Sequence, residues 1–179
     1  MIRPRVIPCL LLLNRGLVKT VKFKNPKYLG DPINVVRIFN DKEVDELVFL
    51  DITATVEKRA PAFDLLRNIT SECFMPLGYG GGITSMEDVR HLLTIGIEKV
   101  ILNTSAAENP ALIGAAAEYA GSSSVVISID VKKNPFGKYE VYTRSGGKAT
   151  GLDPVKLMSG RRESASMASP TTALELIAV

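Results

Sequence analysis

The sequence predicts an α/β protein in which parallel strands are joined by helical crossovers. Short runs that are apolar at every position alternate with longer stretches whose apolar residues recur at helical spacing. One strand and one helix together take up roughly 25 to 30 residues, which is long enough for a crossover between parallel strands. Together these observations indicate a parallel sheet covered by helices.

Each predicted element has its own signals. The strands are apolar on both faces, and the first is too short to be a secretory signal peptide. The helices have apolar residues at i, i+3 and i+4, with capping residues or prolines at several starts and glycines at two ends. The predicted strands are residues 6–13, 46–52, 75–82, 99–105 and 124–130, and the predicted helices are residues 32–44, 60–72, 85–96 and 109–121.

Beyond the fifth predicted strand the pattern changes. Residues 132–151 contain the alternating segment YEVYT between two glycine-containing turns, which predicts a short β-hairpin. Residues 153–154, an Asp-Pro pair, are suited to start a fifth helix. Residues 158–172 are polar, small and aperiodic. We therefore expect residues 1–157 to form one partial domain and residues 158–179 to be a tail that is disordered or frame-disrupted.

Composition narrows the classes of function. The chain has 179 residues, 46% hydrophobic and 23% charged, as expected for one folded domain. A net charge of +3 is too small to favour nucleic acid or an anionic membrane as a partner. Because the two cysteines lie apart in apolar segments and His91 is the only histidine, we expect no zinc site and no histidine-activated nucleophile. We predict a cytoplasmic protein with no metal, cofactor or transmembrane helix.

Two closures of the predicted sheet compete, an open doubly wound sheet and a (β/α)8 barrel. A complete barrel takes about 250 residues, so this chain is too short to close one. We expect an open edge after the fifth strand, and hence a marginal monomer, self-association or dependence on a partner.

Polar residues and glycines stand where the predicted strands end. Ligands of parallel α/β sheets bind at the carboxyl ends of strands, and a glycine turn lets backbone N–H groups approach an anion. The alternatives are a flexible turn, a capped connection and, for the aspartates, a loop-organising role instead of acid/base catalysis. The candidates for a shared phosphate pocket and its chemistry are Asp51, Gly80, Gly81, Gly82, Asn103, Thr104 and Asp130.

Three charged residues, Arg5, Glu46 and Lys99, come directly before predicted strands, at the amino ends of those strands. Considered alone, such charges are usually solvated and contribute little to stability.

Four segments together resemble a known family. DELVFLDITATVEKR (45–59), GYGGGITSMEDV (78–89), EKVILNTSAAENP (98–110) and VVISIDVKK (125–133) occur in this order. They resemble the cyclase subunit of imidazole glycerol phosphate synthase, the (β/α)8 half of a glutamine amidotransferase in histidine biosynthesis. The resemblance implies a lyase that receives ammonia from a glutaminase partner. The ammonia attacks a bis-phosphorylated ribulosyl formimino aminoimidazole carboxamide ribonucleotide.

The resemblance also implies roles for individual residues. Asp130 matches one of two catalytic aspartates, and Asp51 matches a carboxylate that contacts the substrate. Lys19 matches a lysine of a mobile first loop. Gly81, Gly82, Asn103 and Thr104 match one of two substrate phosphate sites, while Arg5, Glu46 and Lys99 match three members of a charged gate through which ammonia enters the barrel.

Two departures from the family pattern shape the final expectation. Leu11 stands where the family has its other catalytic aspartate, and leucine can neither give nor take a proton. Strands six to eight, the second phosphate site and the fourth gate residue are also missing, so we expect an incomplete TIM (β/α)8 barrel of about five parallel strands, truncated at its C-terminal side. The alternative functions are an ammonia-channelling partner of an N-sugar amidotransferase in surface-polysaccharide (lipopolysaccharide) biosynthesis and an inactive fragment.

Overall fold

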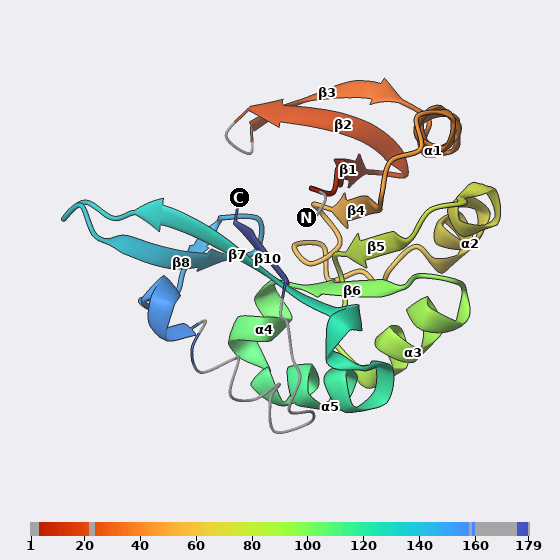
Figure 1. The fold of residues 1–179 in the computed structure, drawn as a ribbon. Coiled ribbons are helices and arrows are strands. Elements are labelled where there is room, and N and C mark those ends of the chain that lie inside the picture. The colour runs from red at the N-terminus through yellow and green to blue at the C-terminus, as the bar shows by residue number, and fades with distance from the viewer. Residues whose placement is uncertain (1–3, 22–23, 158, 160–174, 179) are drawn as a thin grey trace.

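The parallel strands lie next to one another in the order in which they follow in the chain. The computed structural model describes residues 4–21, 24–157, 159 and 175–178. Each parallel strand pairs with its sequence neighbour, which confirms the predicted α/β fold with helical crossovers (Figure 1). The strands are β1 (Cys9–Leu13), β4 (Leu47–Asp51), β5 (Leu77–Gly80), β6 (Lys99–Leu102) and β7 (Val125–Lys133).

The crossover helices begin where the sequence supplies caps. Asp31 accepts hydrogen bonds from the first turn of α1, and Ser85 forms a reciprocal capping box with Asp88 in α3. Only α4 was not predicted, because Asn103 and Thr104 begin a helical turn where the sequence pattern favoured a longer strand. The helices are α1 (Pro32–Asp41), α2 (Phe63–Glu72), α3 (Met86–Thr94), α4 (Thr104–Glu108) and α5 (Pro110–Ala120), with a 3-10 turn at Ser122–Ser124.

Two antiparallel additions flank the parallel strands. The predicted hairpin is confirmed: β7 extends to Lys133 and pairs with β8 (Tyr139–Thr143), which pairs with β9 (Lys148–Ala149). The other addition was not predicted. β2 (Gly16–Val21) pairs with β1 and with β3 (Lys24–Gly30). Asn14 and Arg15 have positive φ angles of 48° and 71°, which makes the tight turn from β1 into β2.

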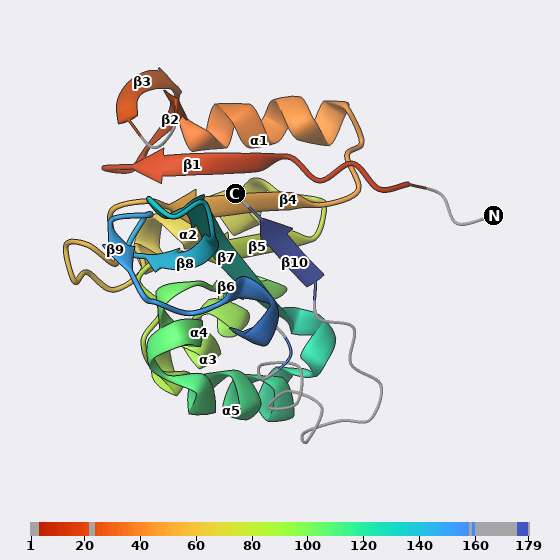
Figure 2. The ribbon, with the colours of Figure 1, turned by 90° about the vertical axis from the view of Figure 1, so that its left-hand side faces the viewer.

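The edge of β7 that we expected to be open has partners. β10 (Glu175–Ala178) runs parallel to β7 and pairs with its residues 126–129, while β8 pairs with its residues 130–133 (Figure 2). Residues 175–178 of the predicted tail therefore form a strand beside β7. Residues 158, 160–174 and 179 of that tail lie outside the described part of the chain.

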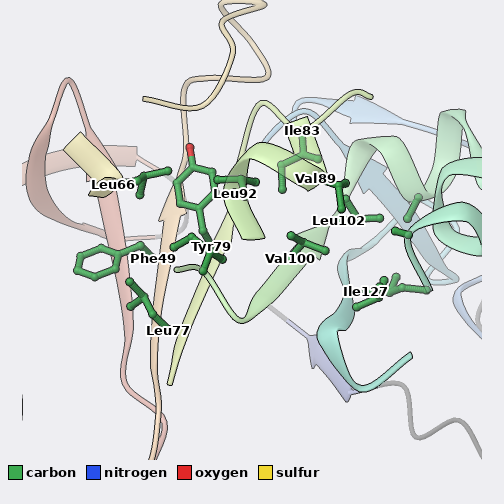
Figure 3. Packing of buried hydrophobic residues seen from close by; sticks show 14 of the residues in the cluster. Phe49, Leu66, Leu77, Tyr79, Ile83, Val89, Leu92, Val100, Leu102 and Ile127 are labelled. Atoms are coloured by element: carbon green, nitrogen blue, oxygen red, sulfur yellow. The ribbon is translucent and has the colours of Figure 1, made fainter. Parts of the chain in front are cut away.

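The main core lies between the parallel strands and their helices. Phe49 and Tyr79 point to this side and pack with Leu66 and Leu92 (Figure 3). The alternate residues of the strands form a smaller cluster on the inner face, made of Val48, Ile101 and Val126 with Leu50. This separation follows from the two-residue period of a strand, and it leaves the inner face to build the site. Among the described helices, none is long and apolar enough to cross a membrane.

Candidate functional site

A cavity of about 890 Å³ opens at the carboxyl ends of the parallel strands, and we call it the mouth cavity. Its walls come from β1 to β7, together with the loop after β4 and the turn after β8. Most of the predicted site residues line it, namely Asp51, Gly80, Gly81, Gly82, Asn103, Thr104 and Asp130. The structure therefore brings residues from distant parts of the chain to one cavity.

Asp130 lies on the inner face of β7, opposite Tyr142 of β8, and only 6% of it is exposed. Burial raises the pKa of its carboxyl group above the ordinary value of 3.8, because a charged carboxylate loses hydration there. The Gly146 amide, the Lys132 charge and the Asn103 side-chain amide oppose this rise in pKa. Asp130 is thus a buried acid whose proton is held more tightly than usual, a property that suits a group in acid/base chemistry.

The glycine turn after β5 leaves no space for side chains. Gly81 and Gly82 have φ angles of 117° and 72°. A Cβ atom on Gly81 would lie 2.4 Å from the carbonyl oxygen of Asp51, and one on Gly82 would lie 2.5 Å from that of Arg59. The Gly82 N–H donates to Thr55 Oγ1 at 3.2 Å. The turn is therefore packed tightly against the loop after β4.

The end of β6 is tied to its neighbours by side-chain hydrogen bonds. Asn103 Nδ2 donates to the carbonyl oxygen of Ser128 at 3.1 Å. Thr104 Oγ1 accepts a hydrogen bond from the Arg144 N–H at 3.0 Å. Ser145 Oγ donates to the carbonyl oxygen of Ile52 at 2.7 Å. These bonds hold the turn after β8 across the mouth cavity, from β6 to β4.

Asp51 has the contacts of a loop organiser. Its Oδ1 accepts hydrogen bonds from the backbone N–H groups of Thr53 and Ala54 at 3.0 and 2.9 Å. Its Oδ2 lies 3.4 Å from the guanidinium of Arg59. The loop-organising alternative thus describes what Asp51 does in this structure, while its edge on the mouth cavity remains available to a ligand.

Lys19 does not line the mouth cavity. It is exposed on β2, in register with Lys27 of β3, whereas the next residue, Thr20, does line the cavity. Sequence analysis missed Ser128, although its place two residues before Asp130 on the same strand would have put it on the same face. It also missed Pro26 of β3, because the hairpin that contains it had no recognised strand pattern.

Leu11 also lines the mouth cavity, together with Leu13 of the same strand. An apolar side chain therefore stands on the β1 wall, across the parallel strands from Asp130.

A charged cluster lies at the amino ends of the strands. Glu46 is only 3% exposed, and its Oε2 lies 2.9 Å from Lys99 Nζ and 3.5 Å from Arg5 Nη1. The structure thus brings these three residues together, so the solvated-charge interpretation is wrong for Glu46. We call this group the amino-end cluster. The described residues contain no group of histidine, cysteine and carboxylate side chains arranged to hold a metal ion.

Comparisons with known proteins agree with this architecture. Residues 5–167 match the family model described as histidine biosynthesis protein. A protein of Alkaliphilus metalliredigens named imidazole glycerol phosphate synthase subunit HisF is 45% identical over 155 residues, 87% of this chain and 62% of that protein. Two proteins given the same subunit name provisionally are similar to the chain as well. One from Leptospira interrogans is 49% identical over 159 residues (88% of this chain, 63% of that protein), and hisF2 of Pseudomonas aeruginosa is 50% identical over 156 residues (87% and 62%).

The chain spans about three fifths of the length of these relatives. The family model covers most of the chain and includes every residue discussed above in the mouth cavity and the amino-end cluster. The chain therefore belongs to the histidine biosynthesis protein family.

Proposed function

We propose that this chain is a cyclase-subunit-type protein of imidazole glycerol phosphate synthase that binds a phosphorylated small molecule in the mouth cavity. The observation that supports this most is the convergence of Asp130, the Gly81–Gly82 turn and the Asn103–Thr104 pair on one cavity. Its volume of about 890 Å³ suits a metabolite of the size of a nucleotide.

Asp130 is the acid/base group of the proposed reaction. Ammonia that attacks an imine-type carbon must lose a proton, and the departing amine must gain one. A carboxyl group with a raised pKa is suited to both transfers, because its protonated and ionised forms are closer in free energy near neutral pH. The hydrogen-bonding amides of Gly146 and Asn103 stabilise the ionised form between the transfers.

The amino-end cluster supports the use of ammonia from a glutaminase partner. Between this cluster and Asp130 lies the apolar inner face, with Val48, Ile101 and Val126. An apolar surface favours neutral ammonia over ammonium, because a charged ion pays a large desolvation cost there. We propose that a glutaminase delivers ammonia at the amino ends and that it reaches the mouth cavity along this face.

Leu11 favours a second candidate function. Leu11 lines the β1 wall of the mouth cavity, at the position where the family resemblance implies a second catalytic aspartate. A leucine there cannot transfer a proton in the proposed cyclase reaction. A chain that only receives ammonia and passes it to an N-sugar amidotransferase, in surface-polysaccharide biosynthesis, does not need that group.

The test is ammonia-dependent turnover of the ribulosyl substrate by the purified chain. We expect Asp130→Asn to lower turnover by about 10²-fold or more, as loss of a general acid/base does. We expect Leu11→Asp to raise it, and Asp41→Asn, an exposed carboxylate at the end of α1, to leave it unchanged. Turnover that is absent from the parent chain and from Leu11→Asp contradicts the cyclase proposal. Co-purification with an N-sugar amidotransferase then supports the second candidate.

A further inference from the structure

A second cavity, of about 430 Å³, lies behind the loop that connects β4 to α2. Asp51 lines both this cavity and the mouth cavity, so its side chain stands between the two. The other polar walls are Asn14 and Arg15 of the β1–β2 turn, Arg59 of the β4–α2 loop, Asp64 in the first turn of α2, and Tyr79 of β5. We call it the helix-side cavity.

The Tyr79 hydroxyl forms part of the inner wall. Tyr79 is 1% exposed, and its hydroxyl has no hydrogen-bond partner among the described residues. In Figure 3 the ring stands between Leu66 and Leu92, and the hydroxyl points out of this apolar packing. Burial raises the pKa of this phenol, so the hydroxyl remains protonated and is a hydrogen-bond donor. A buried donor without a partner lowers stability, so such groups are rare in folded proteins and call for an explanation.

Two guanidinium groups also line the helix-side cavity. Arg15 Nη2 donates to Asp64 Oδ2 at 2.6 Å, and both side chains are more than half exposed. Arg59 donates to Glu57 through Nε at 2.7 Å, its Nη2 donates to Thr53 Oγ1 at 3.0 Å, and both terminal nitrogens lie 3.4 Å from Asp51 Oδ2. Each guanidinium has five N–H donors, so both retain donors for a ligand.

The start of α2 adds a third attraction for a negative charge. Ala62 stands at the N-cap and provides no capping side chain for this ten-residue helix. Asp64 in the first turn supplies the negative charge there, and the Arg15 contact lowers its pKa. Since the Asp64 side chain is 69% exposed, it can move into water when another anion replaces it.

We propose that the helix-side cavity binds a phosphate group, held by the Tyr79 hydroxyl and by the guanidinium groups of Arg15 and Arg59. Binding displaces Asp64 from Arg15 and gives the Tyr79 hydroxyl an acceptor. This site is separate from the mouth cavity, and the proposal does not depend on the proposed function.

The test titrates the whole chain, labelled with ¹³C at the tyrosine ζ carbons, with inorganic phosphate at constant ionic strength. The chain has five tyrosines, so the NMR spectrum is simple. Tyr79→Phe identifies the Tyr79 signal, which is also the signal that resists alkaline titration. We expect this signal to shift saturably with phosphate. Arg15→Gln is expected to raise the midpoint about tenfold, which corresponds to about 1.4 kcal/mol. Asp64→Asn is expected to lower the midpoint, because it removes the competing carboxylate.

Two controls locate the phosphate. Arg37→Gln removes a guanidinium of similar exposure, 58%, which pairs with Glu72 on another surface, and we expect no change in the midpoint. Thr104→Val alters the mouth cavity, and we again expect no change. A Tyr79 signal that does not respond to phosphate overturns the proposal. It is equally overturned if Thr104→Val abolishes the response, or if Arg15→Gln and Arg37→Gln have the same effect.

Discussion

The two ends of the parallel sheet each bury a carboxylate, but the groups around the two carboxylates differ. Glu46 at the amino ends is 3% exposed and lies against Lys99 and Arg5. Asp130 at the carboxyl ends is 6% exposed, and burial outweighs the donors around it, so its pKa is raised. A buried charge that is paired contributes to structure, whereas one that is incompletely compensated can take part in proton transfer.

We expect the largest loss of stability when the paired carboxylate, Glu46, is removed. Glu46→Leu removes a carboxylate that is 3% exposed and lies 2.9 Å from Lys99 Nζ. Breaking a buried ion pair costs about 3 to 5 kcal/mol, so we expect a loss of that size in the free energy of unfolding, measured with urea. Glu72→Leu is the control, since its pair with Arg37 is exposed on both sides, and it should cost less than about 1 kcal/mol. Equal losses would mean that the amino-end cluster is only a surface feature.

The mouth depends on its backbone as well as on its carboxylate. We expect Gly81→Ala to cost about 2 kcal/mol or more, because the Cβ atom meets the Asp51 carbonyl at 2.4 Å and φ is 117°. Gly137→Ala is the matched control. It has a φ of 76° but open space around the added atom, so it should cost only the backbone strain of about 1 kcal/mol. Urea unfolding measures both, and a Gly81→Ala loss no larger than that of Gly137→Ala would contradict the tight packing of the turn.

The sequence predicted the parallel strands and most crossovers because their signals are local. Apolar runs such as LVFLD and caps such as Ser85 with Asp88 determine β4 and α3 within a few residues. The β2–β3 hairpin has no such signal: Lys19, Lys24 and Lys27 interrupt the alternation, and pairing with β1 decides the structure. The pairing of β10 with β7 joins segments about 50 residues apart, which no local pattern reveals.

The residues of the mouth cavity could likewise be predicted only in part from the sequence. Strand ends in a parallel sheet meet by topology, so Asp51, Asn103 and Asp130 could be placed at one edge from sequence alone. The contacts of Asp51 with Thr53, Ala54 and Arg59 could not be predicted from the sequence. Two of the donors are backbone N–H groups, and their direction depends on the conformation of the loop. The sequence also could not show that the Tyr79 hydroxyl has no hydrogen-bond partner within the described part of the chain, because the apolar pattern of a strand does not indicate what a tyrosine hydroxyl will contact.

The smallest expected effect is a pH dependence of the free energy of unfolding that is due to Asp130. Its folded-state pKa is raised, so the folded chain holds this proton more tightly than the unfolded chain. The resulting stability is fully present below the ordinary pKa of 3.8 and is lost as pH rises through the folded-state value. Asp130→Asn cannot ionise and should not show this loss. The free energy of unfolding of the variant, relative to the parent, should therefore rise between pH 4 and neutrality. A constant difference across that range would show that burial does not raise the pKa of Asp130.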